Sequence, residues 1–200
     1  MEIIMNNKLT TKDLIITGIF SAIYFVLNFC VMISGGLTPI LWIMMPVILA
    51  LICGTVYMML VAKVPKRGPV LIMSVITALI YLATGQFTIL ILIAYLISSI
   101  AAELIRALFG YKSFVGNLIG YCAFSLGIVS SPLQLWIFGD EFIDNITQNG
   151  MPVEYVQKLT ALISSSTLII MITATIIGAV IGGYIGKKIM YKHLIKAGIV

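Results

Sequence analysis

The feature that most constrains this chain is a series of long apolar runs with no charge through their centres. The six runs span residues 14–33, 40–62, 69–84, 87–109, 114–138 and 159–185. The hydrocarbon core of a bilayer is about 30 Å thick, and about 20 helical residues cross it. A lysine or aspartate at the centre of such a helix costs about 2.5–3.5 kcal/mol on insertion scales. The runs therefore predict an all-α integral membrane protein, with six transmembrane helices in one bundle and a single domain over residues 1–200.

The third and fourth runs are almost continuous and resemble one long helix over residues 69–109. At 1.5 Å per residue, such a helix would reach about 60 Å, or about twice the thickness of the bilayer core. The sequence Thr84-Gly85-Gln86 interrupts the run with a turn-like polar step. We therefore expect two spans joined by a tight turn.

Basic residues between the runs predict the orientation of the chain. With the N-terminus inside and six spans, every lysine and arginine except Lys158 falls in a cytoplasmic segment. Such an excess is what the positive-inside rule describes, so both termini are expected in the cytoplasm. The first run is too long for the apolar part of a signal peptide, and no A-x-A-like cleavage site follows it. It is expected to remain as an uncleaved first span.

Composition excludes several classes of function. The chain is 61% hydrophobic and 10% charged, whereas soluble domains carry roughly 25% charged residues. The net charge of +5 lies in short clusters without a basic stripe interleaved with aromatics, so no nucleic-acid partner is expected. Cys30, Cys53 and Cys122 lie inside apolar runs without a C-x-x-C motif, which favours small buried hydrophobes over metal or disulfide chemistry.

The residues needed for enzymatic or ATP chemistry cannot be assembled from this sequence. The single histidine, His193, lies in the tail, which excludes a serine–histidine dyad within the membrane. Gly186-Lys187-Lys188 is like the end of a Walker A motif, but Ile181 stands where the motif has its first glycine. The spans also lack the buried charge pairs of many ion-coupled pumps. We predict no enzyme activity, no cofactor and no metal site.

Small residues recur at four-residue spacing on two of the runs, and small residues allow another helix to approach closely. The last run carries Ala174, Gly178, Gly182 and Gly186. Helix packing within the chain is the favoured role of this set, and a partner surface is the alternative. The first run carries Thr17 with Ser21 and Gly18 with Ala22. Packing in the bundle and docking of a partner are about equally supported there.

Charged groups near the ends of the spans and in the outer loop suggest two further features. Glu103 and Arg106 are three residues apart and can face each other on a helix. A pair that snorkels to the interface is favoured, and contact with a partner is the alternative. The outer loop over residues 139–158 is acidic, and Pro152 predicts a helix that continues into the last span. The acidity hints at a cationic solute, but cytoplasmic positive charge already leaves acidic residues outside.

Polar side chains near the outer ends of the spans are candidates for a ligand pocket. They are Tyr81, Thr84, Gln86, Gln134, Trp136 and Ser164. Trp42 and Tyr95 lie at a similar level, but tryptophan and tyrosine there are most often interfacial anchors. The two glutamines are the strongest candidates, because an amide near the membrane needs a hydrogen-bond partner.

Several short segments, taken in order, resemble one family of membrane proteins. They are Leu9–Leu14 with Gly18–Phe25, Thr84–Gln86, Ala102–Ile105, Tyr111–Ser113, Leu118–Tyr121 with Phe124–Leu126, and Lys196–Ile199. With six spans and no ATP site, the chain is similar to the substrate-binding S components of energy-coupling factor (ECF) transporters. More closely, it resembles the bacterial Trep_Strep family of predicted S components.

The resemblance implies a mechanism that composition does not provide. S components bind a vitamin, metal ion or other micronutrient near the outer face. They dock through small residues of the first span onto a membrane coupling protein, and two cytoplasmic ATPases drive the cycle. Gly18 and Ala22, with Thr17 and Ser21 beside them, match that docking motif, although the family pattern is richer in alanine. The resemblance also implies a bacterial cytoplasmic membrane as the location.

The leading functional prediction is a transport subunit that captures a small solute for an ATP-driven importer. An autonomous small-solute transporter or channel is one alternative, and it would transport without ATPase partners. A structural membrane partner that binds no solute is another. A membrane enzyme would need a nucleophile–base pair or a metal cluster that these residues do not form. Neither the solute nor the pocket residues can be identified from the sequence.

Overall fold

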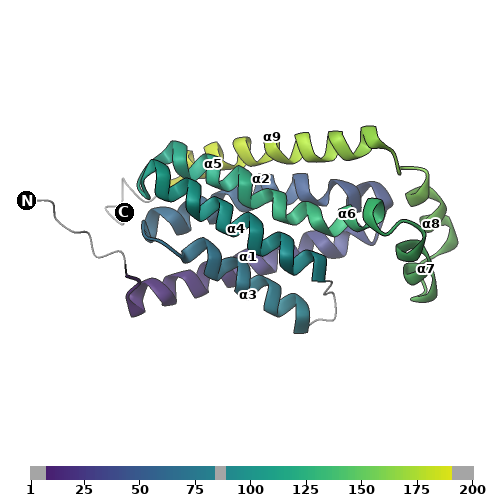
Figure 1. The fold of residues 1–200 in the computed structure, drawn as a ribbon, viewed down its shortest axis with the longest axis horizontal. Coiled ribbons are helices and arrows are strands. Elements are labelled where there is room, and N and C mark those ends of the chain that lie inside the picture. Colours follow the sequence, from purple (N-terminus) through teal and green to yellow (C-terminus); the bar gives the residue numbers. More distant parts are fainter. Residues whose placement is uncertain (1–7, 84–88, 191–200) are drawn as a thin grey trace, which may run out of the picture.

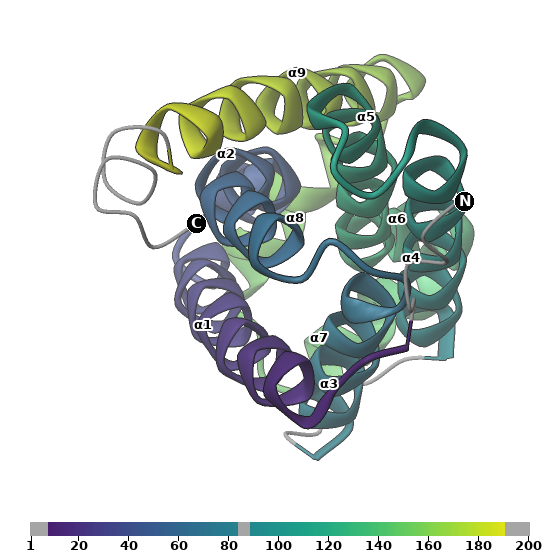
Figure 2. The same cartoon turned by 90° about the vertical axis from the view of Figure 1, so that its left-hand side faces the viewer.

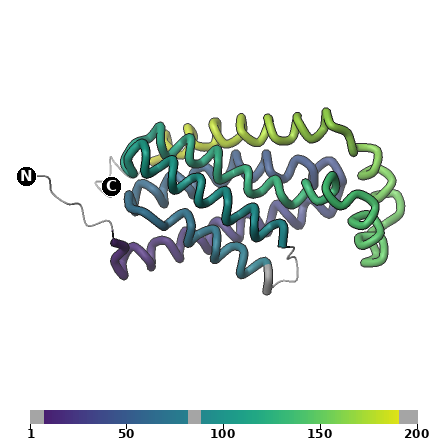
Figure 3. The backbone as a smooth tube through the Cα atoms, in the orientation of Figure 1, coloured from purple at the N-terminus to yellow at the C-terminus, as the bar shows by residue number. Residues whose placement is uncertain are grey.

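The computed structural model describes residues 8–83 and 89–190, and every regular element in this part of the chain is a helix. The long helices are α1 (Thr11–Gly35), α2 (Pro39–Lys63), α3 (Pro69–Ala83), α4 (Ile89–Phe109) and α9 (Ser165–Met190). Between α4 and α9 lie α5 (Phe114–Ser125), the 3-10 helix η1 (Leu126–Val129), α6 (Ser130–Ile137), α7 (Asp140–Gln148) and α8 (Val153–Thr160). The elements α5, η1 and α6 follow one another as a single rod (Figure 3).

Consecutive long helices run in opposite directions along one bundle (Figure 1). Helix α1 begins and α9 ends at the same end, which we call the basic end, whereas α7 and α8 lie across the opposite end, the cap end. Among the described residues, the lysines and arginines other than Lys158 lie in or beside helix turns at the basic end. Seen from the basic end, α2 lies between α1 and α9 (Figure 2).

Five helical segments within the described ranges are long and apolar enough to cross a membrane. They are α1, α2, α4, the rod from Phe114 to Ile137, and α9. The predicted third span corresponds to α3, whose 15 residues reach about 22 Å at 1.5 Å per residue. This length is less than the roughly 30 Å of a bilayer core. The predicted turn at residues 84–86 lies outside the described residues.

The last predicted span and the outer loop differ from the structure. Residues 139–158 are largely helical, in α7 and α8, and the helix that follows Pro152 ends at Thr160 instead of continuing into the membrane. The last long helix begins at Ser165, six residues later than predicted. Ser164 provides the physical reason, because its hydroxyl accepts the backbone N–H of Thr167 at 3.1 Å. This hydrogen bond is that of a helix N-cap, so a new helix starts there.

Helices α2 and α9 approach each other closely through glycine. A Cβ placed on Gly182 would lie 2.5 Å from the carbonyl oxygens of Ala50 and Leu51. A Cβ on Gly186 would lie 2.9 Å from the Gly54 oxygen, and one on Gly178 would lie 3.0 Å from the Val47 oxygen. Three members of the predicted packing set therefore lie on the α2 side of α9, and Ala174, one turn earlier, is half-buried.

A buried ion pair joins α4 to its neighbours near the basic end. Arg106 Nη1 donates to Glu103 Oε1 at 3.0 Å, and Arg106 Nε donates to Asn117 Oδ1 on α5 at 2.9 Å. The same Glu103 oxygen accepts the Val70 N–H at the start of α3, at 2.9 Å. Arg106 is 0% exposed and Glu103 is 8% exposed.

The predicted position of this pair was therefore wrong, and so was the prediction that the spans lack a buried charge pair. The two side chains do face each other at the predicted spacing, but they point into the bundle instead of snorkelling to the interface. Asn117 and the start of α3 supply polar partners that the spacing along α4 could not reveal, and such partners are what a buried ion pair requires.

The start of α1 is capped and tied to the loop between α2 and α3. The Thr10 hydroxyl accepts the Asp13 N–H at 3.3 Å, and Asp13 Oδ2 accepts the Thr10 N–H at 2.7 Å. This reciprocal arrangement is a capping box. Lys66 Nζ donates to the same carboxylate oxygen at 2.6 Å, so one acidic side chain orders both the helix start and the neighbouring loop.

Candidate ligand-binding cavity

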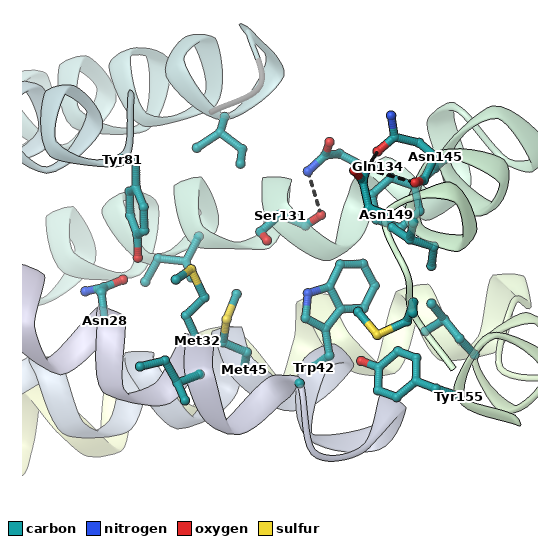
Figure 4. Close-up of a pocket in the computed structure, with 18 of the residues that line it drawn as sticks. Asn28, Met32, Trp42, Met45, Tyr81, Ser131, Gln134, Asn145, Asn149 and Tyr155 are labelled. Carbon is teal, nitrogen blue, oxygen red and sulfur yellow. Dashed lines mark hydrogen bonds between the residues drawn. The ribbon is translucent and has the colours of Figure 1, made fainter. Parts of the chain in front are cut away.

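A cavity of about 790 Å³ lies toward the cap end of the bundle. Side chains from α1, α2, α3 and α4 form its inner part, and η1, α6, α7 and α8 complete its wall (Figure 4). Most of the wall is apolar or aromatic, with a few amides and hydroxyls. This combination is typical of small-molecule sites, in which a few polar groups orient a ligand within an apolar space.

The inner end of the cavity is polar and buried. Asn28 on α1 is 0% exposed, and its amide nitrogen donates to the Tyr24 carbonyl at 2.9 Å. The Tyr95 hydroxyl on α4 donates to Asn28 Oδ1 at 3.4 Å. The Tyr81 hydroxyl on α3 points toward the same amide (Figure 4). Three helices therefore direct hydrogen-bonding groups to one point within the bundle.

The middle of the cavity is mainly apolar. Met32 and Met45 project into it between the inner end and the cap (Figure 4), and Ile91 and Ile128 complete this part of the wall. Methionine is unbranched and polarisable, so it fills irregular space and adapts to the shape of what it contacts. The middle therefore offers mainly dispersion contacts, and Ser131 is its labelled polar residue (Figure 4).

The cap end of the cavity is polar again, and it is more exposed. Gln134 on α6 donates to the Ser131 carbonyl at 3.1 Å. At the end of α7, the Asn149 amide donates to the Asn145 carbonyl oxygen at 2.9 Å and to its side-chain oxygen at 3.1 Å. Asn145 and Asn149 are exposed, so the cavity opens beside them.

Helix α7 turns its acidic residues away from the cavity. Its cavity face consists of residues at helical spacing, namely Phe142, Asn145, Ile146 and Asn149. Asp140, Glu141 and Asp144 are exposed and do not line the cavity. On α8, Glu154 and Lys158 pair at 2.7 Å at the exposed surface, and the hydrogen bond from Lys158 lowers the pKa of Glu154. The acidic residues of α7 and α8 therefore do not indicate the charge of a ligand in the cavity.

Two contacts hold the cap helices to the bundle, and a third fixes the turn that follows α8. The Trp42 ring on α2 stacks on Phe142 of α7, with centroids 5.6 Å apart. The Tyr155 hydroxyl on α8 donates to the Gly35 carbonyl at the end of α1, at 3.0 Å. Trp136 Nε1 donates to the Ser164 carbonyl at 3.1 Å, which joins α6 to the turn before α9. These contacts fix the position of the cap over the opening.

Replacing Tyr155 with phenylalanine is expected to loosen the cap without unfolding the bundle. The change removes the hydrogen bond to Gly35, and a typical intramolecular hydrogen bond contributes about 1 kcal/mol. A loss of this size would raise the open population of the cap by about fivefold. Faster proteolysis between α7 and α8 is the measurement. Tyr184→Phe on the exposed face of α9 is the control, and equal cleavage of both variants would contradict the prediction.

The predicted pocket residues divide into three groups. Tyr81 and Gln134 line the cavity. Trp136 and Ser164 do not line it and instead contact each other. Thr84 and Gln86 lie outside the described residues. Asn28 lines the cavity as well and was not predicted, although an amide within an apolar run is a signal of the same kind as the two glutamines. Trp42 and Tyr95, for which the role of interfacial anchor was favoured, both belong to the cavity wall.

The predicted docking residues lie on two different faces of α1. Thr17 and Ser21 are 0% exposed, and their hydroxyls donate to the backbone carbonyls one turn earlier. These two residues face the bundle. Gly18 and Ala22 face outward, and a Cβ on Gly18 would meet nothing within 4 Å. The structure thus leaves the outward pair available to another helix and encloses the inward pair.

Within the described part of the chain, no group of three or more histidine, cysteine, aspartate or glutamate side chains could hold a metal ion. The three cysteines are unpaired with one another. Cys53 is buried beside Asn28, whereas Cys30 is exposed on the outer surface of α1. The interpretation of the cysteines as small buried hydrophobes therefore fits Cys53 and is wrong for Cys30.

The apolar helices and their arrangement define a multi-pass α-helical membrane protein. The profile of the family described as "Hypothetical bacterial integral membrane protein (Trep_Strep)" matches residues 11–196, so the chain belongs to this family. The resemblance noted from the short sequence segments is thereby confirmed for the family. No curated protein and no solved structure matches the chain. A location in the bacterial cell membrane is consistent with the family and with the five candidate spans.

Proposed function

We propose that this protein is the substrate-binding subunit of an ATP-driven importer of the ECF type. In this role it captures a small solute in the cavity and depends on a membrane coupling protein with two cytoplasmic ATPases for energy. The cavity beneath α7 and α8 is the observation that carries the proposal. A structural membrane partner would have no need for a space of this size with convergent amides and hydroxyls.

The charge distribution supports an outward-facing cavity. The described basic residues other than Lys158 gather at the basic end, and the acidic side chains of α7 and α8 lie at the cap end. Under the positive-inside rule the basic end faces the cytoplasm. The cavity then opens toward the external medium, which is where an importer must meet its solute.

The outward face of α1 supports docking of a partner helix. Gly18 adds no side chain, and Ala22, one turn later on the same face, adds a single methyl group. Close helix approach in membranes uses small residues of this kind. The enclosed positions of Thr17 and Ser21 restrict the proposed contact to Gly18 and Ala22.

Replacing Gly18 and Ala22 together with leucine is expected to abolish partner binding while the protein still folds. The space around a Gly18 Cβ is open, so the added bulk projects from the bundle and obstructs only an approaching helix. The tagged chain is purified in mild detergent from its native membrane, and co-purifying proteins are identified by mass spectrometry. The variant should lose the coupling protein and ATPases by at least about tenfold.

Ala107→Leu is the matched control, because Ala107 is exposed on α4 and receives similar added bulk at a different surface. It should retain the partners at the level of the unmodified chain. If the unmodified protein retained no coupling protein or ATPase, even with the coupling module supplied, the transport-subunit proposal would be abandoned. Transport by the chain alone in vesicles would then favour an autonomous transporter.

A further inference from the structure

The wall of the cavity carries no acidic or basic side chain among the described residues. Its polar groups are amides and hydroxyls, and the acidic residues of α7 point elsewhere. The segment over residues 68–102, which includes the residues between α3 and α4, also has no aspartate, glutamate, lysine, arginine or histidine in its sequence. A ligand in the cavity therefore has no formal countercharge in the described wall.

An ion would be poorly accommodated at the inner end. Asn28 is fully buried and Tyr95 is 4% exposed, so an ion placed there would lose most of its contact with water. Removing a charge from water is costly unless an opposite charge and hydrogen bonds compensate. Neutral amide and hydroxyl groups supply only the hydrogen bonds. This chemistry favours an uncharged hydrogen-bonding group at the inner end.

Most of the polar groups lie at the two ends of the cavity, and Ser131 lies between them (Figure 4). Asn28 and Tyr81 are at the inner end, and Gln134 and Asn145 are at the cap end, with methionines between them (Figure 4). Hydrogen-bonding groups are most favourable where protein partners can meet them, and apolar groups are most favourable against the methionines. The wall is therefore complementary to a molecule that is polar at both ends and mainly apolar in the middle.

We propose that the cavity takes an uncharged solute with hydrogen-bonding groups at both ends and an apolar middle. This inference rests on the proposed function and assigns a chemical class to the solute of that same site. The acidic loop that hints at a cation is set aside, because its carboxylates face solvent. Ions are disfavoured because a charge beside the buried Asn28 would lose its water. Solutes of suitable length are favoured because they can form hydrogen bonds at both polar ends.

A matched series of small probes tests the class directly. The probe 4-hydroxyphenethyl alcohol is uncharged, with a hydroxyl at each end of an apolar middle. Tyramine replaces one end with a cation, 4-hydroxyphenylacetate replaces it with an anion, and 2-phenylethanol lacks the second polar end. Adenosine and adenosine 5′-monophosphate provide a larger neutral and anionic pair. Binding to the purified full chain is measured by equilibrium dialysis with mass-spectrometric detection.

The uncharged two-ended probes are expected to bind at least about tenfold more tightly than their charged counterparts. Asn28→Asp should weaken their binding by at least about tenfold, because it places a carboxylate at the buried end. Gln148→Glu places the same charge on the exposed surface of α7, outside the cavity wall, and should change binding by less than about twofold. If Asn28→Asp fails to fold, Ser131→Asp introduces the charge at a half-buried position in the wall.

Tighter binding of tyramine, 4-hydroxyphenylacetate or the monophosphate would overturn the assigned class while leaving a solute-binding function in place. Binding of 2-phenylethanol as tight as that of the two-ended alcohol would overturn the requirement for two polar ends. Failure of every probe to bind would overturn the inference as a whole. A chain that bound the neutral probes but recruited no coupling partner would instead overturn the transport-subunit proposal and leave the solute class intact.

Discussion

Gly182→Leu is expected to separate α2 from α9 and to destabilise the folded bundle by about 3 kcal/mol or more. The Cβ alone would lie 2.5 Å from two backbone oxygens of α2. Backbone cannot rotate away as a flexible side chain can, so the two helices must move apart along their shared length. The variant should show a large loss of thermal stability in detergent, measured by the midpoint of unfolding and by the yield of monodisperse protein.

Gly18→Leu provides the matched control for this experiment. It makes the same substitution in the middle of a long apolar helix, but no atom lies within 4 Å of the added Cβ. Its unfolding midpoint should remain close to that of the unmodified chain. Equal stability of the two variants would show that α2 and α9 do not approach as closely as the structure indicates.

Arg106→Met is expected to have the second large effect, destabilising the bundle by about 3–5 kcal/mol. The substitution keeps the apolar bulk but leaves the Glu103 carboxylate buried without its cation. It also removes the hydrogen bond from the guanidinium to Asn117. Unfolding in detergent, followed by a shift in its midpoint, is again the measurement.

A second substitution separates the loss of pairing from the loss of packing. Combining Arg106→Met with Glu103→Gln removes both charges, and the amide oxygen can still accept the Val70 N–H. The double variant should therefore be more stable than Arg106→Met alone. Lys112→Met, which removes an exposed charge at the same end, should have little effect. A cost for Arg106→Met no larger than that of Lys112→Met would mean that Arg106 reaches water.

The membrane class and most of the helices were predictable because they depend on local properties of the chain. A run of about 20 apolar residues crosses a bilayer whatever its neighbours are, and basic clusters mark its ends. The family resemblance also came from ordered local segments. The predicted helix boundaries were wrong where a single side chain sets the helix start. An example is Ser164, whose hydroxyl caps α9 after the turn that follows α8.

By itself, then, the sequence determined that this is a multi-pass helical membrane protein with small residues at four-residue spacing on two of its long helices. The tertiary structure decided which of those side chains meet. One cavity is lined by residues from three helices that are far apart in the sequence, namely Asn28, Tyr95 and Asn145. The acidic residues of α7 do not line it. The rotation of each helix about its axis follows from packing against several neighbours at once, and no single run of residues specifies that rotation.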